Sequence, residues 1–361
     1  GLVAPGAPFA GGFGGGDPIT IPGFNISQVD SDVLRAADTA VVAFGPDLSF
    51  SLAGTTVSST ARGPSISGNL LKPEIGAPGA SVSAEVGTGT ERTPFGGTSG
   101  ASPMVAGSAA LVLQDCRESG ETAPGRGLGS GGGDACAPAT LKAKLMNNAF
   151  RDIISDTTGD LAEITRIGAG EVRVDDATAS TMVAYGVEDG QPKLGLGFLD
   201  LSKRAFVRRT VEVENRGDSL LFLDVAPTFR FPDKAATGAV QAFTRSLMVV
   251  PPGRSRSLPV YFRMDPDALT GNFMNSGSVG NDPAALSAME YAGYLTLTDR
   301  RSGEQIALPW HVLPRKAAEV VADSDTLPTG GGFVGLTNVG AGPAQNDAYV
   351  KAREWIDASI A

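Results

Sequence analysis

The sequence contains very little histidine. Of its 361 residues, one is a histidine, His311, and two are cysteines. A histidine-rich metal site is therefore excluded, and any mechanism that takes a histidine from this sequence depends on one residue. No apolar run approaches the ~18 residues that span a bilayer, because the best one, residues 104–113, is interrupted by Gly107 and Ser108. We expect no membrane span in this sequence.

Basic residues are also scarce. Lysine and arginine number 29 against 39 acidic residues, which gives a net charge of −10. Because binding to phosphates needs a basic surface, this balance argues against a nucleic-acid partner. Hydrophobic residues, at 42%, are enough to build real cores, and the length favours two or three domains.

The two cysteines, Cys116 and Cys136, flank a glycine-rich stretch at 125–133. They are either two free thiols or a disulfide that closes a surface loop, and we favour the disulfide. Closing a loop of this size stabilises a fold by roughly 3 kcal/mol in the chain-entropy model. A disulfide would also indicate an oxidising compartment, extracellular or periplasmic.

The first half of the chain has mixed α/β character. The sequence begins at Gly1 without a charged-then-apolar signal segment, so we interpret it as a piece of a longer protein. The strongest predicted helix, 101–114, is apolar on nearly all sides, which is typical of a buried helix. The other predicted elements are helices at 30–37 and 141–149 and strands at 41–44 and 81–86.

From Arg208 onward the hydrophobic pattern alternates with period two. Strands separated by turn signals predict an all-β sandwich that closes at Pro314. The remaining residues end in a predicted helix at 347–359 and are too short for a domain, so we expect them to begin a further module. The predicted strands are 210–214, 220–225, 246–250, 257–263, 291–298 and 305–312.

The stretch from Gly96 to Gly107 carries the chemistry. Small residues precede Ser99, and an apolar helix follows at once. The first N–H groups of a helix are unpaired and carry partial positive charge, so they stabilise an oxygen or an anion beside them. Pro103 falls near the first turn, where a missing N–H costs least. Ser99 alone does not decide between a nucleophile and a helix N-cap.

Four motifs between residues 59 and 177 identify a resemblance. The sequence Gly-Thr-Ser-Gly-Ala-Ser-Pro-Met-Val-Ala-Gly at 97–107 closely resembles the serine signature of the subtilases, the subtilisin-like serine proteases. Lys-Pro-Glu-Ile-Gly-Ala-Pro-Gly at 72–79 is similar to the family's Lys-Pro-Asp-Ile-x-Ala-Pro-Gly segment. Residues 59–64 resemble Ser-Ser-Arg-Gly-Pro with one extra residue, and 168–177 resemble the close of the protease domain.

Weaker similarities extend the resemblance. Residues 21–27, with Leu34, look like the end of a protease-associated insert, and segments 291–295 and 306–310 are similar to a fibronectin-type-III-like domain. The resemblance implies an α/β fold, the C-terminal half of a subtilisin-like parallel-sheet domain, followed by a fibronectin-type-III-like β-sandwich. The implied units are the end of the insert (1–45), half of the catalytic domain (46–190), the sandwich (200–315) and the start of a further module (316–361).

The family chemistry is peptide hydrolysis, and it implies a role for Ser99. The serine oxygen attacks the peptide carbonyl, a histidine takes its proton, an aspartate holds that histidine, and an asparagine with the serine N–H stabilises the oxyanion. Only the serine maps here, onto Ser99, with Gly97, Thr98 and Gly100 as support at the helix mouth. The Asp, His and Asn are expected before Gly1, so this chain alone should be inactive and should need the missing N-terminal half. The resemblance implies a secreted or cell-envelope endopeptidase that acts on proteins or peptides.

Two other functions are consistent with parts of the sequence. In α/β-hydrolases the nucleophile lies in Gly-x-Ser-x-Gly and the histidine comes last, so a triad of Ser99, an Asp and His311 is formally open. Ala101 at the fifth position and the absence of a predicted strand at 88–94 argue against it. The other alternative is a catalytically degenerate subtilase that serves as a binding or adhesion scaffold.

The remaining candidates are weaker. His311 lies in the predicted strand 308–313, and we expect a structural or exposed residue there rather than a base. Residues 11–16 are predicted to form a loop, and the pair Asn147–Asn148 to end a helix. Asp175 and Asp176 are expected to point apart on a strand into solvent, so no metal site is assigned. No cofactor is predicted; calcium is left open without a ligand set.

Overall fold

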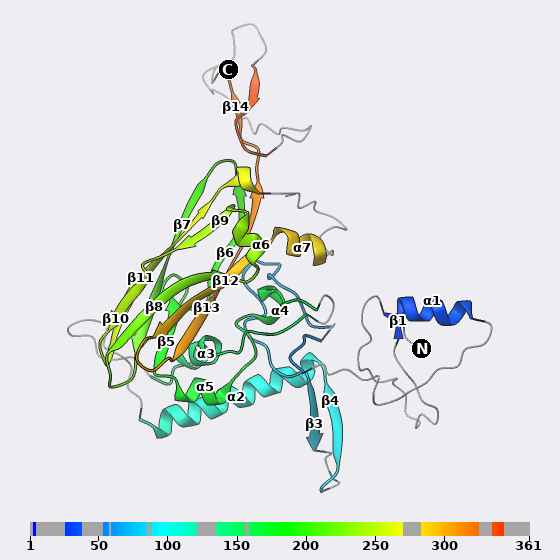
Figure 1. Cartoon of the computed structure of the whole chain (residues 1–361), viewed down its shortest axis with the longest axis vertical. Coiled ribbons are helices and arrows are strands. Elements are labelled where there is room, and N and C mark those ends of the chain that lie inside the picture. The colour runs from blue at the N-terminus through cyan, green and yellow to red at the C-terminus, as the bar shows by residue number, and fades with distance from the viewer. Residues whose placement is uncertain are drawn as a thin grey trace, which may run out of the picture.

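The computed structural model describes residues 3–4, 26–37, 53–57, 59–84, 87, 89–120, 135–155, 159–269, 283–324 and 334–342. The predictions for 11–16, 41–44, 125–133 and 347–359 fall outside these ranges. The described residues form a helical region between residues 53 and 179 and a β-region between 182 and 316 (Figure 1). Helix α1 (Gln28–Ala36) overlaps the helix predicted at 30–37 and follows the short parallel pair β1 (Val3–Ala4) and β2 (Ile26–Ser27).

The helical region contains the two predicted helices with shifted ends. Helix α2 (Thr98–Glu118) includes the predicted range 101–114. Helix α3 (Pro138–Asn147) begins earlier than predicted because Pro138 takes its first position, where the missing N–H costs nothing. The other elements are the antiparallel hairpin β3 (Ala80–Ala84) and β4 (Arg92–Gly96) and the short helices α4 (Ile164–Ile167) and α5 (Val174–Ala179).

Helix α2 is not buried on all sides, so that prediction was wrong. Ser108, Val112 and Cys116 recur every four residues on one face and are buried. Val112 and Cys116 belong to a cluster with residues of α3 and α5, the two helices that lie beside α2 (Figure 1). Met104 and Leu111 are 39% and 54% exposed. A run of Ala, Val and Leu shows that a helix can be buried, but burial also requires neighbours on every side, and the described residues cover one face.

The parallel sheet expected here is reduced to two isolated parallel bridges among the described residues. One joins Gly76 to Glu171, and the other joins Thr55 to Ile154. Pro78 lies two residues beyond Gly76 and has no N–H to donate, so the segment cannot extend its ladder.

The β-region consists of two packed sheets. The five-stranded sheet has the order β10-β8-β12-β13-β6, and the four-stranded sheet has the order β5-β7-β11-β9. Neighbouring strands are antiparallel except β13 and β6, which are parallel. The strands are β5 (Met182–Gly186), β6 (Leu194–Leu201), β7 (Ala205–Asn215), β8 (Leu221–Phe229), β9 (Val240–Phe243), β10 (Leu247–Val250), β11 (Arg254–Met264), β12 (Tyr291–Asp299) and β13 (Gln305–Lys316).

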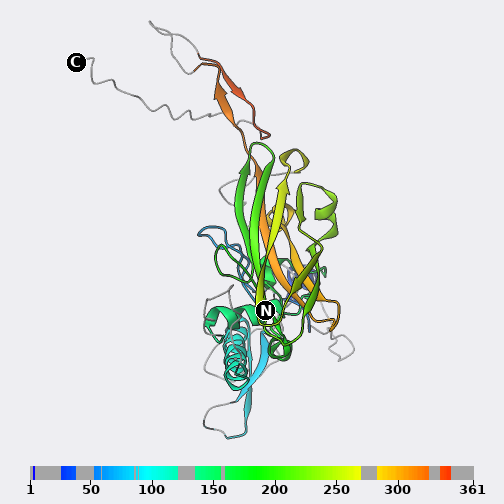
Figure 2. The same ribbon diagram turned by 90° about the vertical axis from the view of Figure 1, so that its left-hand side faces the viewer.

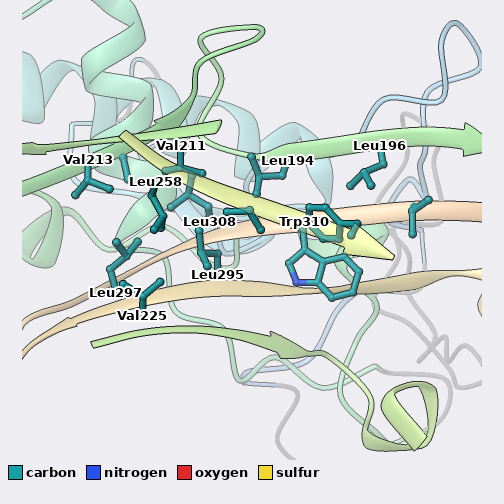
Figure 3. Close-up of a cluster of buried hydrophobic side chains, with 14 of the residues drawn as sticks. Leu194, Leu196, Val211, Val213, Val225, Leu258, Leu295, Leu297, Leu308 and Trp310 are labelled. Carbon is teal, nitrogen blue, oxygen red and sulfur yellow. The ribbon is translucent and has the colours of Figure 1, made fainter. Parts of the chain in front are cut away.

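The core of the β-region lies between these sheets. Leucine, valine and isoleucine side chains from both sheets meet around Trp310, which is fully buried (Figure 3). The Trp310 ring packs edge-on against Phe229 at 5.0 Å between centroids and lies 5.4 Å from Phe262. Its Nε1 donates a hydrogen bond to Thr228 O at 3.1 Å, so the one polar atom of the ring is satisfied.

The β-region is longer than predicted at both ends. Strands β5 and β6 begin before residue 200 and are members of the two sheets. Pro314 does not close the region, because β13 runs on to Lys316. Beyond Val312, β13 pairs only with β6, so the missing N–H of Pro314 costs no bond to β12.

The remaining elements lie at the edges of the sheets. The hairpin of β14 and β15 extends beyond the end of the two sheets, at the top of both views (Figure 1, Figure 2). These elements are α6 (Pro232–Ala236), the 3₁₀ turn Pro266–Ala268, α7 (Pro283–Met289), β14 (Val320–Ala322) and β15 (Leu336–Asn338).

The strand pair β12 and β13 packs against both regions, one on each face. One face of the pair belongs to the sandwich core, and the opposite face packs on the helical region. On that second face Ala292, Tyr294 and Ala307 form one buried cluster with Leu71 and Ile164 from the helical region. The helical region therefore has a fixed position on the β-region.

Arg230, which follows β8, also fixes this arrangement. Its guanidinium donates to the main-chain oxygens of Ala162 at 2.8 Å, Arg151 at 2.8 Å and Ile153 at 3.0 Å. All three acceptors lie in loops of the helical region. Because burial disfavours the charged form, the pKa of Arg230 is lowered, with the nearby Tyr294, Asp152 and Glu163 acting in the opposite direction.

Candidate active site

Ser99 is the second residue of α2, and it is exposed. The N-cap is Gly97, with φ 79° and ψ −171°, and no side chain caps the helix. The interpretation of Ser99 as a helix N-cap is therefore wrong. The positive φ of Gly97 is easy only for glycine, and this turn leaves Ser99 Oγ without a hydrogen-bond partner among the described residues.

Pro103 lies deeper in α2 than the sequence suggests. It is the sixth residue of the helix rather than part of the first turn. In an α-helix the N–H of residue 103 would bond to the carbonyl of residue 99. Proline has no N–H, so the carbonyl of Ser99 lacks its usual helical donor at this position.

The β3–β4 hairpin brings two of the sequence motifs together. Ala80 pairs with Gly96 at the base of the hairpin, so the end of segment 71–79 lies beside the turn before Ser99. The two backbones approach closely: a Cβ on Gly79 would lie 3.2 Å from Gly97 O, and one on Gly96 would lie 3.1 Å from Gly79 O, both tighter than ordinary van der Waals contact. Glycine at positions 79 and 96 therefore lets the two backbones approach without displacement.

A second contact joins segment 71–79 to the motif that begins at Gly168. The N–H of Ala169 donates to Glu74 O at 2.9 Å, and the N–H of Gly76 donates to Gly170 O at 2.8 Å. Gly168 has φ +62°, and a Cβ there would lie 2.3 Å from Glu74 C and O. Motifs far apart in the sequence thus form one packed backbone unit next to the helix mouth.

Glu74 is the electrostatic centre of this unit. Its carboxylate meets Lys193 Nζ at 2.5 Å, Lys142 Nζ at 2.7 Å and Lys72 Nζ at 3.1 Å. Burial alone would raise the pKa of Glu74, but hydrogen bonds from these lysines lower it to about 2. The sequence motif includes Glu74 and Lys72, but Lys193 lies 119 residues away and gave no signal.

His311 is a buried structural residue. The sequence predicted either a structural or an exposed residue here, and the first is confirmed. It lies in β13 with no exposed surface, and its ring nitrogens have no hydrogen-bond partner among the described residues. Its Nε2 is 3.9 Å from Glu290 Oε1. Burial lowers the pKa of His311, while Glu290 acts in the opposite direction. A histidine enclosed in this way cannot take a proton from the exposed Ser99.

This position removes the α/β-hydrolase alternative, although one argument against that alternative was wrong. A strand, β4, does precede Ser99, but it pairs antiparallel with β3 in a two-stranded hairpin. A nucleophile elbow instead follows a strand of the main sheet.

The structure joins Cys116, near the end of α2, to Cys136, just before α3, with an S–S distance of 2.05 Å. Asp175 and Asp176 are exposed, but they do not lie on a strand. They lie in the first turn of α5, where negative charge is favourable. No group of three or more metal-ligating side chains occurs among the described residues.

Asn147 ends α3 as predicted, but the sequence did not reveal what it binds. It is 1% exposed, its Oδ1 accepts from Ala184 N at 2.8 Å, and its Nδ2 donates to Ala307 O at 3.4 Å. One amide thus connects α3 to a strand of each sheet.

Comparison with known proteins agrees with the motifs. Residues 26–186 match the model of the subtilase family. The match supports a subtilisin-like serine protease relationship for the helical region. The minor extracellular protease Vpr of Bacillus subtilis (strain 168) is 26% identical over 178 residues, which are 46% of this chain and 20% of that protein. The chain therefore spans about a fifth of the length of this curated relative.

Solved structures give partial similarity. Tripeptidyl peptidase 2 aligns with a TM-score of 0.32 and 14% identity, covering 63% of this chain and 17% of that chain. A FixG-related protein from Vibrio parahaemolyticus aligns with a TM-score of 0.24 and 14% identity, covering 37% of this chain and 94% of that chain. No helix among the described residues is long and apolar enough to cross a membrane.

Proposed function

We propose that Ser99 is the nucleophile of a secreted subtilisin-like serine endopeptidase. One observation carries the proposal: the Ser99 hydroxyl lies exposed in the first turn of α2, without a hydrogen-bond partner among the described residues, two residues after the Gly97 that segment 71–79 contacts. The match to the subtilase family over residues 26–186 supports the same reaction class.

In this mechanism Ser99 Oγ attacks the carbonyl carbon of a peptide bond in a protein or peptide substrate. The tetrahedral oxygen that forms carries negative charge, which the Ser99 N–H and the positive end of the α2 dipole stabilise. Gly97, Thr98 and Gly100 leave the approach to this N–H open. The proton acceptor, its aspartate and the oxyanion asparagine are proposed to lie outside this sequence, because the one histidine present is enclosed in β13.

The finer organisation is also proposed. We take residues 1–45 as the end of a protease-associated insert, 46–190 as half of the catalytic domain, 200–315 as a fibronectin-type-III-like sandwich and 316–361 as the start of another module. The two packed sheets support the third assignment. The disulfide and the extracellular relative support a location outside the cytoplasm.

The test is labelling with a fluorophosphonate, which reacts with activated serines. We expect it to label Ser99 in the full-length protein and to leave both the 361-residue chain and a full-length Ser99→Ala variant unlabelled. Removing one member of a catalytic triad costs several powers of ten in rate, so the difference is large.

Two outcomes would contradict the proposal. Rapid labelling of Ser99 in the 361-residue chain would mean that a base exists within it. Failure to label the full-length protein, or peptide hydrolysis that survives Ser99→Ala, would remove Ser99 as the nucleophile and favour the degenerate scaffold.

A further inference from the structure

Lys193 is a buried cation at the boundary between the two regions. Its side chain is 5% exposed, and it directly precedes β6, whose first residue, Leu194, belongs to the sandwich core. Its Nζ donates to Leu71 O at 3.0 Å and to Glu74 Oε1 at 2.5 Å. A β-region residue therefore binds both the backbone and the carboxylate of segment 71–79.

The carboxylate of Glu74 binds three lysines, and we call these four side chains the Glu74 clamp. The other carboxylate oxygen is held by Lys142 of α3 at 2.7 Å and by Lys72 at 3.1 Å. A buried charge is costly without a partner, so Lys193 and Glu74 keep each other in place. The clamp fixes segment 71–79 relative to β6 and α3 at once.

Main-chain contacts connect segment 71–79 to the N-terminus of α2. Five residues after Glu74, Gly79 lies against the carbonyl of Gly97, with room for no more than a tight Cβ contact at 3.2 Å. Gly97 is the N-cap of α2, and Ser99 follows two residues later. Gly79 and Gly97 approach each other through main-chain atoms, so this contact does not depend on the rotamer of a side chain.

We infer that Lys193 is a positioning residue for Ser99, acting from the β-region through the carboxylate of Glu74. The inference rests on the proposed role of Ser99, since positioning has a catalytic meaning only for a nucleophile. It makes the β-region part of the catalytic apparatus rather than an appendage. Lys193 itself touches neither the serine nor a substrate.

The direct test is hydrogen exchange on the full-length protein, read by mass spectrometry, which requires no activity. Lys193→Met keeps the bulk of the side chain and removes the charge, while Glu74 retains two lysines. We expect amides in peptides covering 74–79 and 97–101 to exchange about tenfold faster, as local opening becomes easier. Lys203→Met is the matched control, because Lys203 is 80% exposed and lies 3.8 Å from its partner Glu319; it should leave both peptides unchanged.

A second variant covers the case in which Lys193→Met does not fold. Lys72 holds the same carboxylate but is 50% exposed, so Lys72→Met should be tolerated and should raise exchange in the same two peptides by a smaller factor. Faster exchange at 74–79 with wild-type exchange at 97–101 would overturn the inference, because Lys193 would then be a fold contact only. Unchanged exchange in both peptides would overturn it as well.

Kinetics on the full-length protein separate this inference from the proposed function. Displacement of Ser99 should lower kcat while leaving KM within about twofold, because substrate contacts are retained. If wild type hydrolyses peptides through Ser99 and Lys193→Met has a normal kcat, the positioning role fails and the proposed function stands. If the wild type shows no Ser99-dependent hydrolysis while exchange responds as expected, the proposed function fails and the mechanical coupling stands.

Discussion

Gly168 offers the sharpest test of how the sequence motifs are assembled. It adopts φ +62°, and a Cβ added to it would lie 2.3 Å from Glu74 C and O and 2.7 Å from Ile75 N. All three atoms are main chain, so no side chain can rotate away. Gly168→Ala must therefore displace either its own turn or the main chain at Glu74.

The expected loss has two parts. Gly168 combines φ +62° with ψ −130°, a backbone conformation that glycine adopts readily, and holding a non-glycine residue there costs about 1–3 kcal/mol. Forcing an extra carbon into a packed site costs typically about 1–3 kcal/mol more. We therefore expect Gly168→Ala to lower the free energy of unfolding by about 2–6 kcal/mol.

Gly190→Ala is the matched control. Gly190 has φ +67°, but a Cβ added to it would have nothing within 4 Å, so only the conformational cost of about 1–2 kcal/mol applies. Urea unfolding of both variants, followed by circular dichroism, measures the difference, provided that the denaturant slope is unchanged. Equal losses in the two variants would refute the close approach between the Gly168 motif and Glu74.

Three further predictions concern titration and the disulfide. The pKa of Glu74 falls from 4.5 to about 2 on folding, so its contribution to stability is complete above pH 4.5 and is lost as the pH falls toward 2. The difference in unfolding free energy between wild type and Glu74→Gln should therefore narrow over that pH interval. A difference that stays constant would contradict this prediction. Burial lowers the pKa of His311 below 6.5, so below that pH the unfolded chain binds a proton that the folded chain does not, and stability declines. His311→Leu should lose this part of the decline, which is measured as the unfolding free energy at a series of pH values below 6.5. Cys116→Ser should lower the free energy of unfolding by roughly 3 kcal/mol, and mass spectrometry of unreduced wild type should find Cys116 joined to Cys136 rather than two alkylated thiols.

Regular alternation made much of the β-region predictable. Strands β8 and β11 alternate buried with more exposed residues over many positions, and the predicted ranges 220–225 and 257–263 overlap them. Strand β6 was missed because Leu-Gly-Leu-Gly at its start reads as a turn, although the strand is held by parallel pairing to β13. The four-residue β9 was also missed, although the equally short β10 lies within the predicted range 246–250.

The candidate site was predictable where it is local in sequence. The small residues around Ser99 and the helix after them pointed to the same place that the structure shows. The contacts between this site and distant residues were not predictable. Glu74 binds Lys142 and Lys193, which lie in distant elements, and a hairpin brings Gly79 against Gly97. Nor could the pattern of α2 reveal how much of its surface is covered.

The double-sided burial of β12 and β13 has a consequence for how this polypeptide comes apart. A recombinant piece starting after residue 186 would expose Tyr294 and its neighbours to water, and the piece before it would lose the surface on which Leu71 rests. We expect neither piece to survive alone. Cleavage in the turn at 187–193 should therefore leave the two products bound to each other, melting in a single transition.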